Sequence, residues 1–220
     1  MDKRKSYFLT FDTETTNNFD SPLVYDIGGA IHDRQGNVME TFSFVIYETF
    51  VELKELMESA YYKEKIPTYE KEIKEGKRQL VRLSTAKKHI YNMCKKYNVK
   101  AIIAHNARFD YRSTATTQRY TTCSAVRYFL PYGIPLWDTL EMSKSVIKNK
   151  PTYKNFCEKN GYLTKNNQVK LTAEVIYRFI TNNQDFTEEH TGLADVLIEK
   201  EIFVYCLRQH KKMKKSAWKE

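Results

Sequence analysis

Phe11-Asp12-Thr13-Glu14-Thr15 ends the first apolar run of the chain. Side chains two residues apart on a strand point to the same side of a sheet, so Asp12 and Glu14 are expected to lie together. Carboxylates crowded in this way resist ionising together unless a cation neutralises them. Hard divalent cations such as Mg²⁺ prefer oxygen ligands. The stretch therefore predicts a metal site at the edge of a sheet.

Short apolar runs predict the strands of that sheet. Residues 7–11, 23–32 and 38–46 have the composition of strands, and residues 33–37 contain the residues of a hairpin turn. A hairpin among the early strands indicates that the first three strands are antiparallel.

The later chain alternates helices with short strands. Ser84 or Thr85 is expected to cap a helix that runs to Tyr97, followed by a buried strand over 100–104. Strand, helix and strand in succession indicate a crossover with parallel pairing. Another short strand is expected over 134–137. Further helices are expected over 51–60, 139–147, 153–160, 172–182 and 193–209, with a small hairpin from 163–164 and 169–171. The sequence predicts one α/β domain over residues 1–220, in which helices flank a mixed sheet of about five strands.

Two charged regions stand apart from this pattern. Residues 61–82 are very charged and interrupted by Pro67 and Gly76, which predicts a surface insertion made of a helix and a loop. Residues 211–220 form a basic tail. Such basic ends are either solvated termini or contacts to nucleic acid, and the sequence leaves both interpretations open.

Composition limits the class of protein. Of the 220 residues, 41% are hydrophobic and 14% aromatic, which indicates a globular chain rather than a disordered one. No apolar run approaches the ~20 residues that span a bilayer, and no secretory signal is expected. The net charge of +9 favours a polyanionic partner. The four cysteines are scattered along the chain: Cys94, Cys123, Cys157 and Cys206. Because they show no paired spacing, cytoplasmic localisation with reduced thiols is expected.

Further polar residues lie where later predicted helices begin. Asp110 lies in the first turn of a helix for which Asn106 is the expected N-cap. His190 and Asp195 are separated by about 140° on a regular helix, so they would diverge there. The intervening Thr191-Gly192 step instead predicts that His190 lies on a loop and Asp195 in the first turns of the last helix.

At these residues the chain resembles the DEDDh (DnaQ-like) 3′–5′ exonucleases, the family of the polymerase III proofreading subunit and RNase T. The resemblance runs from about Phe8 to about Tyr205. Asn17 and Asn18 depart from the family, in which a glycine often follows the first motif. The matching segments are Asp12-Thr13-Glu14-Thr15-Thr16, His105-Asn106-Ala107-Arg108-Phe109-Asp110, His190 with Asp195, and Leu136-Trp137-Asp138-Thr139-Leu140.

The resemblance implies an RNase H-like fold and a two-metal phosphodiester hydrolase. Four acids would hold two Mg²⁺ or Mn²⁺ ions roughly 3.5–4 Å apart. His190 would be the general base that removes a proton from water. The product would be nucleoside 5′-monophosphates released from the 3′ end of single-stranded DNA or RNA. The four metal ligands implied are Asp12, Glu14, Asp110 and Asp195.

The same resemblance places substrate contacts beside these acids. Thr13 and Thr15 would hold the terminal nucleotide and its 3′-OH, while His105, Asn106 and Phe109 would lie next to the site. An aromatic ring there can stack on a base. Single-stranded 3′ ends are the expected partner. A polymerase is a second possible partner, as it is for a proofreading subunit.

Other interpretations remain at this stage. A module on the same fold would bind nucleic-acid ends or a polymerase without cutting, although such modules usually lose one of the acids. An oligonuclease acting on very short nucleotides is another. Asp138 is expected to be a helix N-cap, and Phe109 is equally suited to a core position. Tyr61, Tyr62 and Tyr69 alternate with lysine and favour a half-buried helix face over a nucleic-acid contact.

Overall fold

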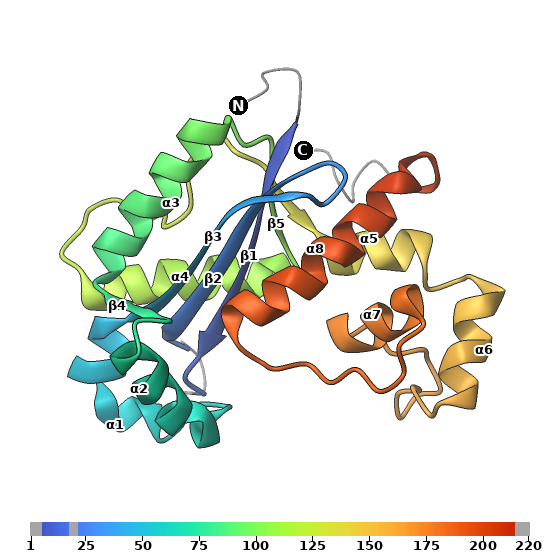
Figure 1. Cartoon of the computed structure of the whole chain (residues 1–220), viewed down its shortest axis with the longest axis horizontal. Helices are drawn as coiled ribbons and strands as arrows, with labels where there is room; N and C mark the ends of the chain where they lie inside the picture. The colour runs from blue at the N-terminus through green and yellow to red at the C-terminus, as the bar shows by residue number, and fades with distance from the viewer. Residues whose placement is uncertain (1–5, 18–21, 214–220) are drawn as a thin grey trace.

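The computed structural model describes residues 6–17 and 22–213, and a sheet of six strands lies at the centre of this part of the chain (Figure 1). The strands are β1 (Tyr7–Thr15), β2 (Val24–Asp33), β3 (Val38–Ile46), β4 (Gln79–Val81), β5 (Ile102–Ala104) and β6 (Leu136–Asp138). Their order across the sheet is β4-β3-β2-β1-β5-β6. β2 is antiparallel to β1 and β3, whereas β4, β5 and β6 join through parallel pairings. The predicted mixed sheet with three antiparallel early strands is confirmed.

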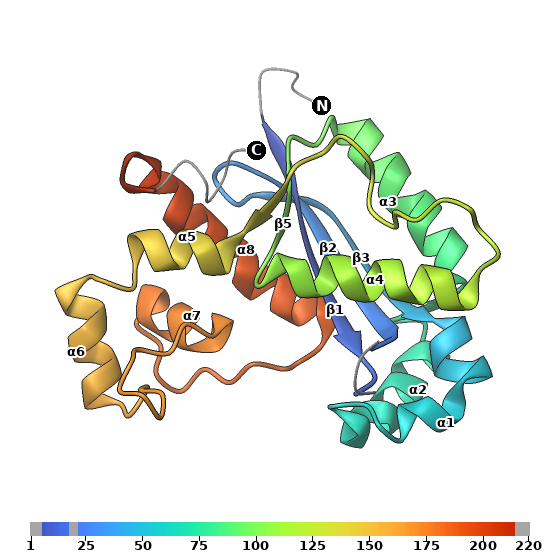
Figure 2. The ribbon, with the colours of Figure 1, turned by 180° about the vertical axis from the view of Figure 1, so that it is seen from behind.

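Helices cover both faces of the sheet (Figures 1 and 2). α3 and α4 lie against one face, and α8 crosses the other in contact with β1 and β2. The α-helices of the described residues are α1 (Lys54–Met57), α2 (Ile66–Lys74), α3 (Leu83–Tyr97), α4 (Ala107–Thr121), α5 (Thr139–Val146), α6 (Pro151–Lys159), α7 (Ala173–Thr181) and α8 (Gly192–Arg208).

The alternation of side chains along β1 divides the core between these two faces. Phe8 packs against Phe203 of α8, with ring centroids 4.9 Å apart. Leu9 belongs to the opposite cluster, which includes Ile90 of α3. Asp12 has the same parity as Phe8, so the strand directs this acid toward α8.

Two strand predictions required correction. β1 does not end near Phe11 but runs to Thr15, because its pairing with β2 continues through Glu14 opposite Asp26. β4 was not predicted at all, since the charged segment 61–82 was expected to contain only a helix and a loop. Three residues of this segment form a strand through parallel pairing with β3, which no local pattern signals.

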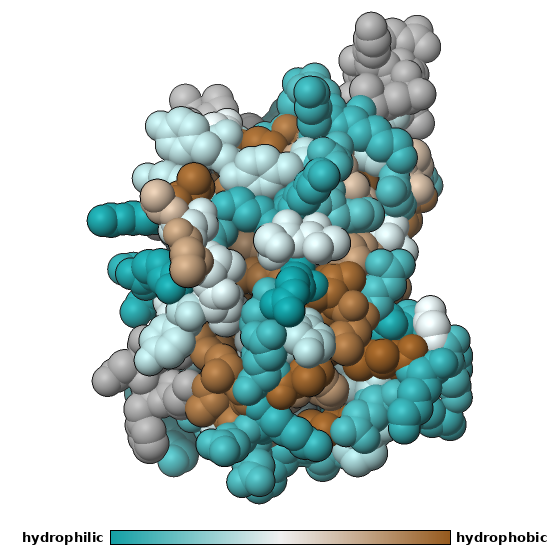
Figure 3. Space-filling model, turned by 90° about the vertical axis from the view of Figure 1, so that its left-hand side faces the viewer, coloured by the Kyte–Doolittle hydropathy of each residue, from teal (hydrophilic) through white to brown (hydrophobic). Residues whose placement is uncertain are grey.

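The edge formed by β4 belongs to a face that combines apolar and polar side chains. Figure 3 shows apolar side chains at the centre of this face, bordered by hydrophilic ones. Leu80 of β4 is 37% exposed and Val51 is 41% exposed.

The start of α3 also differs from expectation. The helix begins at Leu83, and neither Ser84 nor Thr85 caps it. The Leu83 N–H donates instead to Oε2 of Glu48, 2.9 Å away and 35 residues earlier in the chain. A capping partner at this distance in sequence leaves no local signature.

Other predicted segments are shorter or lie outside the description. The helix expected over 51–60 is divided into a π-helical turn, Glu48–Glu52, and the four-residue α1. The hairpin expected after α6 is reduced to one antiparallel bridge between Leu163 and Val169. Residues 214–220 of the basic tail are outside the described residues. Within the described ranges, no helix has both the length and the apolar character needed to cross a bilayer.

Candidate metal centre

Three acids from distant parts of the chain converge where β1 passes beneath α8. Asp12 and Glu14 alternate with residues of the opposite core, so both face this helix, and Asp195 lies in its first turn. One carboxylate oxygen from each of Asp12, Glu14 and Asp195 lies within 4.8 Å of the other two. The structure thus brings together three of the four predicted metal ligands.

Two glycines allow this convergence. Gly28 of β2 is the register partner of Asp12, and it contacts Gly192 at the start of α8. A Cβ atom added to Gly28 would lie 2.0 Å from the carbonyl carbon of Gly192, far inside van der Waals contact. The helix therefore lies with its backbone directly on the sheet, which places Asp195 beside Asp12.

Asp110, the fourth predicted ligand, reaches the same region from α4. It lies in the first turn of α4 and is 3% exposed. Its Oδ1 accepts a hydrogen bond from the Thr13 hydroxyl at 2.7 Å. Asp110 does not belong to the group of three oxygens described above.

The junction before α4 departs from the predicted cap. Asn106 occupies the N-cap position, but its φ of 65° is left-handed and its side chain makes no capping hydrogen bond. Its backbone N–H donates to Oδ1 of Asp138 at 3.0 Å. The same oxygen accepts from the Leu140 N–H at 2.8 Å, so the predicted capping role of Asp138 for α5 is confirmed. Asp138 joins the starts of two helices.

A fifth acid of this region, the buried Glu199, is not among the ligands predicted from the sequence. It lies one turn after Asp195 on the same face of α8, is 3% exposed, and accepts the His105 backbone N–H at 3.1 Å. The spacing of four residues was the available signal, because such residues are neighbours on a helix. Hereafter the acid cluster denotes Asp12, Glu14, Asp110, Asp195 and Glu199.

Burial and mutual repulsion disfavour the charged forms throughout the acid cluster. Burial and then Asp195 raise the pKa of Glu14 to about 9, and burial and then Glu188 raise the pKa of Asp195 to about 8. Burial raises the pKa of Asp110 to about 7. The pKa values of Asp12 and Glu199 are also raised well above their usual range, chiefly by burial and then by neighbouring acids.

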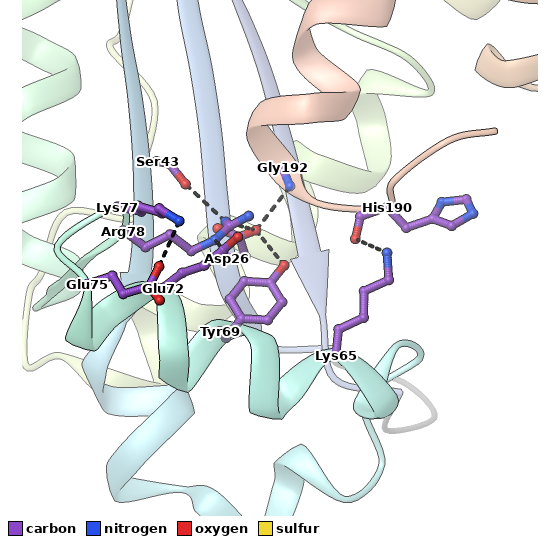
Figure 4. Close-up of polar contacts among 10 residues, drawn as sticks. All are labelled: Asp26, Ser43, Lys65, Tyr69, Glu72, Glu75, Lys77, Arg78, His190 and Gly192. Carbon is purple, nitrogen blue, oxygen red and sulfur yellow. Dashed lines mark hydrogen bonds and ion pairs between the residues drawn. The ribbon is translucent and has the colours of Figure 1, made fainter. Parts of the chain in front are cut away.

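His190 lies on the loop before α8, as predicted, with a left-handed φ of 48°. Its ring stacks on Tyr62 with centroids 4.5 Å apart. Figure 4 shows its backbone carbonyl accepting from the Lys65 amino group at 3.5 Å. Its Nδ1 lies 3.7 Å from Oε2 of Glu188, an acid not singled out in the sequence. Burial lowers the pKa of His190. His190, Glu188 and Asp195 form a second group of ligand atoms within 4.8 Å of one another.

Asp26 of β2 is buried near this site but has a different environment (Figure 4). Its Oδ2 accepts from the Tyr69 hydroxyl at 2.7 Å, from Nη1 of Arg78 at 3.0 Å and from the Gly192 N–H at 3.0 Å. Arg78 also stacks over the Tyr69 ring at 4.4 Å. The segment 61–82 is thereby joined to the start of α8.

Two adjoining clefts give access to the acids. The acid cleft, of about 640 Å³, is lined by all five members of the acid cluster together with His190. The neighbouring cleft, of about 680 Å³, is lined by Tyr61, Tyr62, Arg108 and Arg112 among others and is called the aromatic cleft. Residues that line both include Thr13, Glu14, Tyr62, Asn106 and Phe109.

All five predicted substrate residues border these clefts. Thr13, Asn106 and Phe109 line both, Thr15 lines the aromatic cleft, and His105 lines the acid cleft. Phe109 is 42% exposed, so it is not a core residue. Substrate contacts by these residues stay predictions.

Both ring nitrogens of His105 have protein partners. Nδ1 lies 2.9 Å from the Thr139 hydroxyl, and Nε2 lies 2.8 Å from the Leu171 carbonyl oxygen. These contacts fix the ring at the wall of the acid cleft.

The donors of the acid cluster fit a hard divalent cation. All are carboxylate oxygens, which such cations prefer. Oδ1 of Asp195 is buried and has no hydrogen-bond partner within the described residues. A divalent cation would supply this partner and neutralise acids that raise one another's pKa values. Asp12, Glu14 and Asp195 are the residues best placed to share one ion.

Comparison with solved structures identifies proteins of similar fold. Exonuclease I of E. coli, in complex with a 5cy-dT13 oligonucleotide, aligns with 94% of this chain at a TM-score of 0.58 and 14% sequence identity. The chain spans only 41% of that protein's length. Pop2p of S. pombe, in a Mg²⁺- and Mn²⁺-bound form, aligns with 98% of this chain and 88% of its own, at a TM-score of 0.55 and 14% identity.

A third solved structure shares the fold. Cell-death related nuclease 4 (CRN-4) aligns with 93% of this chain and 64% of its own, at a TM-score of 0.53 and 10% identity. No protein-family model matches the sequence, and no curated protein matches it significantly. The structural likeness confirms the predicted RNase H-like fold, and these neighbours lend no support to a polymerase partner.

Proposed function

We propose that this chain is a metal-dependent 3′–5′ exonuclease of the DEDDh type that hydrolyses single-stranded DNA or RNA. The observation that carries the proposal is the convergence of Asp12, Glu14 and Asp195 within 4.8 Å at the wall of an open cleft. Exonuclease I, whose fold is shared, is described in complex with an oligonucleotide, and Pop2p in a Mg²⁺- and Mn²⁺-bound form. Both descriptions are consistent with this use of the cleft.

The proposed cofactor is a pair of Mg²⁺ or Mn²⁺ ions held by Asp12, Glu14, Asp110 and Asp195. When bound, two such cations neutralise the acids, stabilise the leaving oxygen and lower the pKa of a water molecule. Glu199 is buried in the wall of the same cleft and accepts the His105 backbone N–H. We assign it a supporting role in this wall.

The residues of this chain supply the remaining parts of the reaction. Water adds to phosphorus while the bond from phosphorus to the 3′ oxygen breaks, giving a nucleoside 5′-monophosphate and a new 3′-OH. His190 lines the acid cleft, and its lowered pKa keeps the ring neutral and able to accept the water proton. Phe109 and Tyr61, both exposed in the aromatic cleft, would stack on bases.

Digestion of 5′-labelled oligonucleotides tests the proposal. Matched DNA and RNA, single- and double-stranded, are incubated with Mg²⁺ or Mn²⁺ and with EDTA. We expect single strands to shorten stepwise from the 3′ end, only with metal, and to release mononucleotides. The proposal is lost if every labelled strand stays intact with both metals.

Matched variants separate chemistry from folding. Asp110→Ala is expected to abolish nucleotide release while circular dichroism shows the native fold. Glu141→Gln is the control, because Glu141 is exposed on α5 and pairs only with Lys144 in the described structure. Equal loss of activity in both variants would contradict a specific role for Asp110.

A further inference from the structure

The surface of residues 107–137 has an unusual composition. This stretch covers α4 and the loop that leads to β6, and its only acid, Asp110, is buried. Four arginines and four tyrosines of the same stretch are exposed. The arginine–tyrosine surface is defined here as Arg108, Arg112, Arg119, Arg127, Tyr111, Tyr120, Tyr128 and Tyr132.

A groove of about 500 Å³ crosses this surface between the start of α4 and the loop after it. Its wall includes Tyr111, Tyr128 and Tyr132 together with one arginine, Arg108, one acid, Asp138, and apolar residues such as Leu136. Tyr132 is 85% exposed, and its ring centroid lies 5.8 Å from that of Tyr128. The groove therefore offers aromatic faces to a ligand.

The loop that carries these tyrosines is anchored on α3 (Figure 2). The Lys87 amino group donates to the carbonyl oxygen of Tyr128 and to Gln118 of α4. The Tyr91 hydroxyl donates to the carbonyl oxygen of Leu130 at 3.1 Å. These bonds hold the backbone around the exposed rings, which lowers the entropy lost when a ligand binds.

The groove continues into the site already described. Arg108 lines both this groove and the aromatic cleft, and the aromatic cleft shares Asn106 and Phe109 with the acid cleft. A path lined by arginine and aromatic side chains thus leads from the acids to Tyr132.

We propose that the arginine–tyrosine surface binds the single strand on the 5′ side of the bond to be cut. Arginines would contact phosphates and tyrosines would stack on bases, the combination by which proteins hold single strands without sequence preference. Four exposed arginines beside a single half-buried acid, Asp138, match a polyanion and disfavour a protein partner of mixed charge. The inference rests on the proposed function for the position of the 3′ end, and it identifies the substrate as a polymer rather than a dinucleotide.

Binding is measured by fluorescence anisotropy in EDTA, so that no strand is cut. Labelled single strands of 2, 6, 12 and 20 nucleotides are compared, with a 20-base-pair duplex. We expect the affinity of the wild-type chain to rise with length and to favour the single strand. The double variant Tyr128→Ala/Tyr132→Ala should bind the 20-mer at least about tenfold more weakly and lose most of the length dependence.

Two further variants make the test specific. Arg112→Ala should reduce the slope of log affinity against log salt by about 1, since it removes one phosphate contact. Arg34→Ala, an exposed arginine in the turn between β2 and β3, should leave both slope and affinity unchanged. Tyr132→Phe keeps the ring and should retain the wild-type affinity.

The outcomes distinguish this inference from the proposed function. A chain that binds long strands through Tyr128 and Tyr132 but never cuts them supports the surface and overturns the nuclease. If the wild-type chain cuts short strands but the double variant binds the 20-mer as tightly as the wild type, the inference about the surface is overturned and the nuclease is not. Binding that is equal for strands of 2 and 20 nucleotides also overturns it.

Discussion

Glu14 and Asp26 face each other across β1 and β2, and burial raises the pKa of both carboxyl groups, but the charges around them differ. Oδ2 of Asp26 is compensated from within: Arg78 forms an ion pair with it at 3.0 Å, and two further donors bind the same oxygen, while Oδ1 has no hydrogen-bond partner among the described residues. Among the charges around Glu14, most are other acids that raise its pKa, and Lys65 is the exception.

Charged neighbours therefore separate acids that serve the fold from acids that are available to bind a ligand. A buried charge that the chain neutralises itself joins elements together, here β2, α2 and the start of α8. A group of buried charges that oppose one another costs stability unless something external binds. Substitutions in the acid cluster should therefore mainly lower activity, whereas substitutions around Asp26 should mainly lower the free energy of unfolding.

The largest expected effect is on activity, at the uncompensated acids. Asp12→Ala should reduce single-turnover hydrolysis at least about 10³-fold, because one of the proposed metal ligands is removed. Stability without metal should stay equal or rise, since one repelling carboxylate is gone. Urea unfolding of the same variant checks this second part, and a large loss of stability would contradict the comparison.

At Asp26 we expect the reverse. Arg78→Met leaves a fully buried carboxylate without its cation and should lower the free energy of unfolding by about 3–5 kcal/mol. Urea denaturation measures the loss. Lys71→Met, which removes an exposed ion pair with Glu75, is the control and should cost less than about 1 kcal/mol.

Metal and pH should both change the stability of the folded chain through the acid cluster. The pKa of Glu14 is raised from 4.5 to about 9, so the folded chain retains a proton that the unfolded chain releases. Without metal, stability should therefore fall as pH rises between these two values, because the unfolded state binds fewer protons. A divalent cation binds the ionised acids, so its stabilising effect should grow over the same range.

Thermal melts with and without Mn²⁺ at pH 6 and pH 8.5 test this expectation. A metal at about 100 times its Kd adds about 2.7 kcal/mol to the stability. We expect a larger rise in Tm at the higher pH, and none in a chain carrying both Asp12→Ala and Glu14→Gln. An equal rise at both pH values would show that these acids are not the ligands.

The smallest effect is expected at Tyr69. Tyr69→Phe removes one of three donors to Asp26 and should cost about 1.5 kcal/mol, while Arg78 and Gly192 remain bound. Urea denaturation gives the magnitude. A loss as large as that of Arg78→Met would mean that the hydroxyl, rather than the guanidinium, compensates the buried charge.

Local pattern was enough to predict part of the site. The alternation along a strand placed Asp12 and Glu14 on one side, and the Thr191-Gly192 step separated His190 from the helix that holds Asp195. Glu199 carried a usable signal, because it follows Asp195 by one helical turn.

Other features depend on contacts between distant residues and left no such signal. Arg78 is 52 residues from Asp26, and Glu48 is 35 residues from Leu83, whose N–H donates to it at the start of α3. β4 exists through its pairing with β3. The stack of Tyr62 on His190 is of the same kind, since neither residue has a neighbour in sequence that predicts it.

The contact between Gly28 and Gly192 fixes the distance between α8 and the sheet, and with it the positions of Asp12 and Asp195. The spacing between α8 and the sheet is the thickness of two backbones, with no side chain available to absorb an error. Any residue larger than glycine at either position would push the helix away from the sheet and move Asp195 away from Asp12. A chain with such a substitution would keep its strands, its helices and every acid, but its carboxylates would lie too far apart to share one ion.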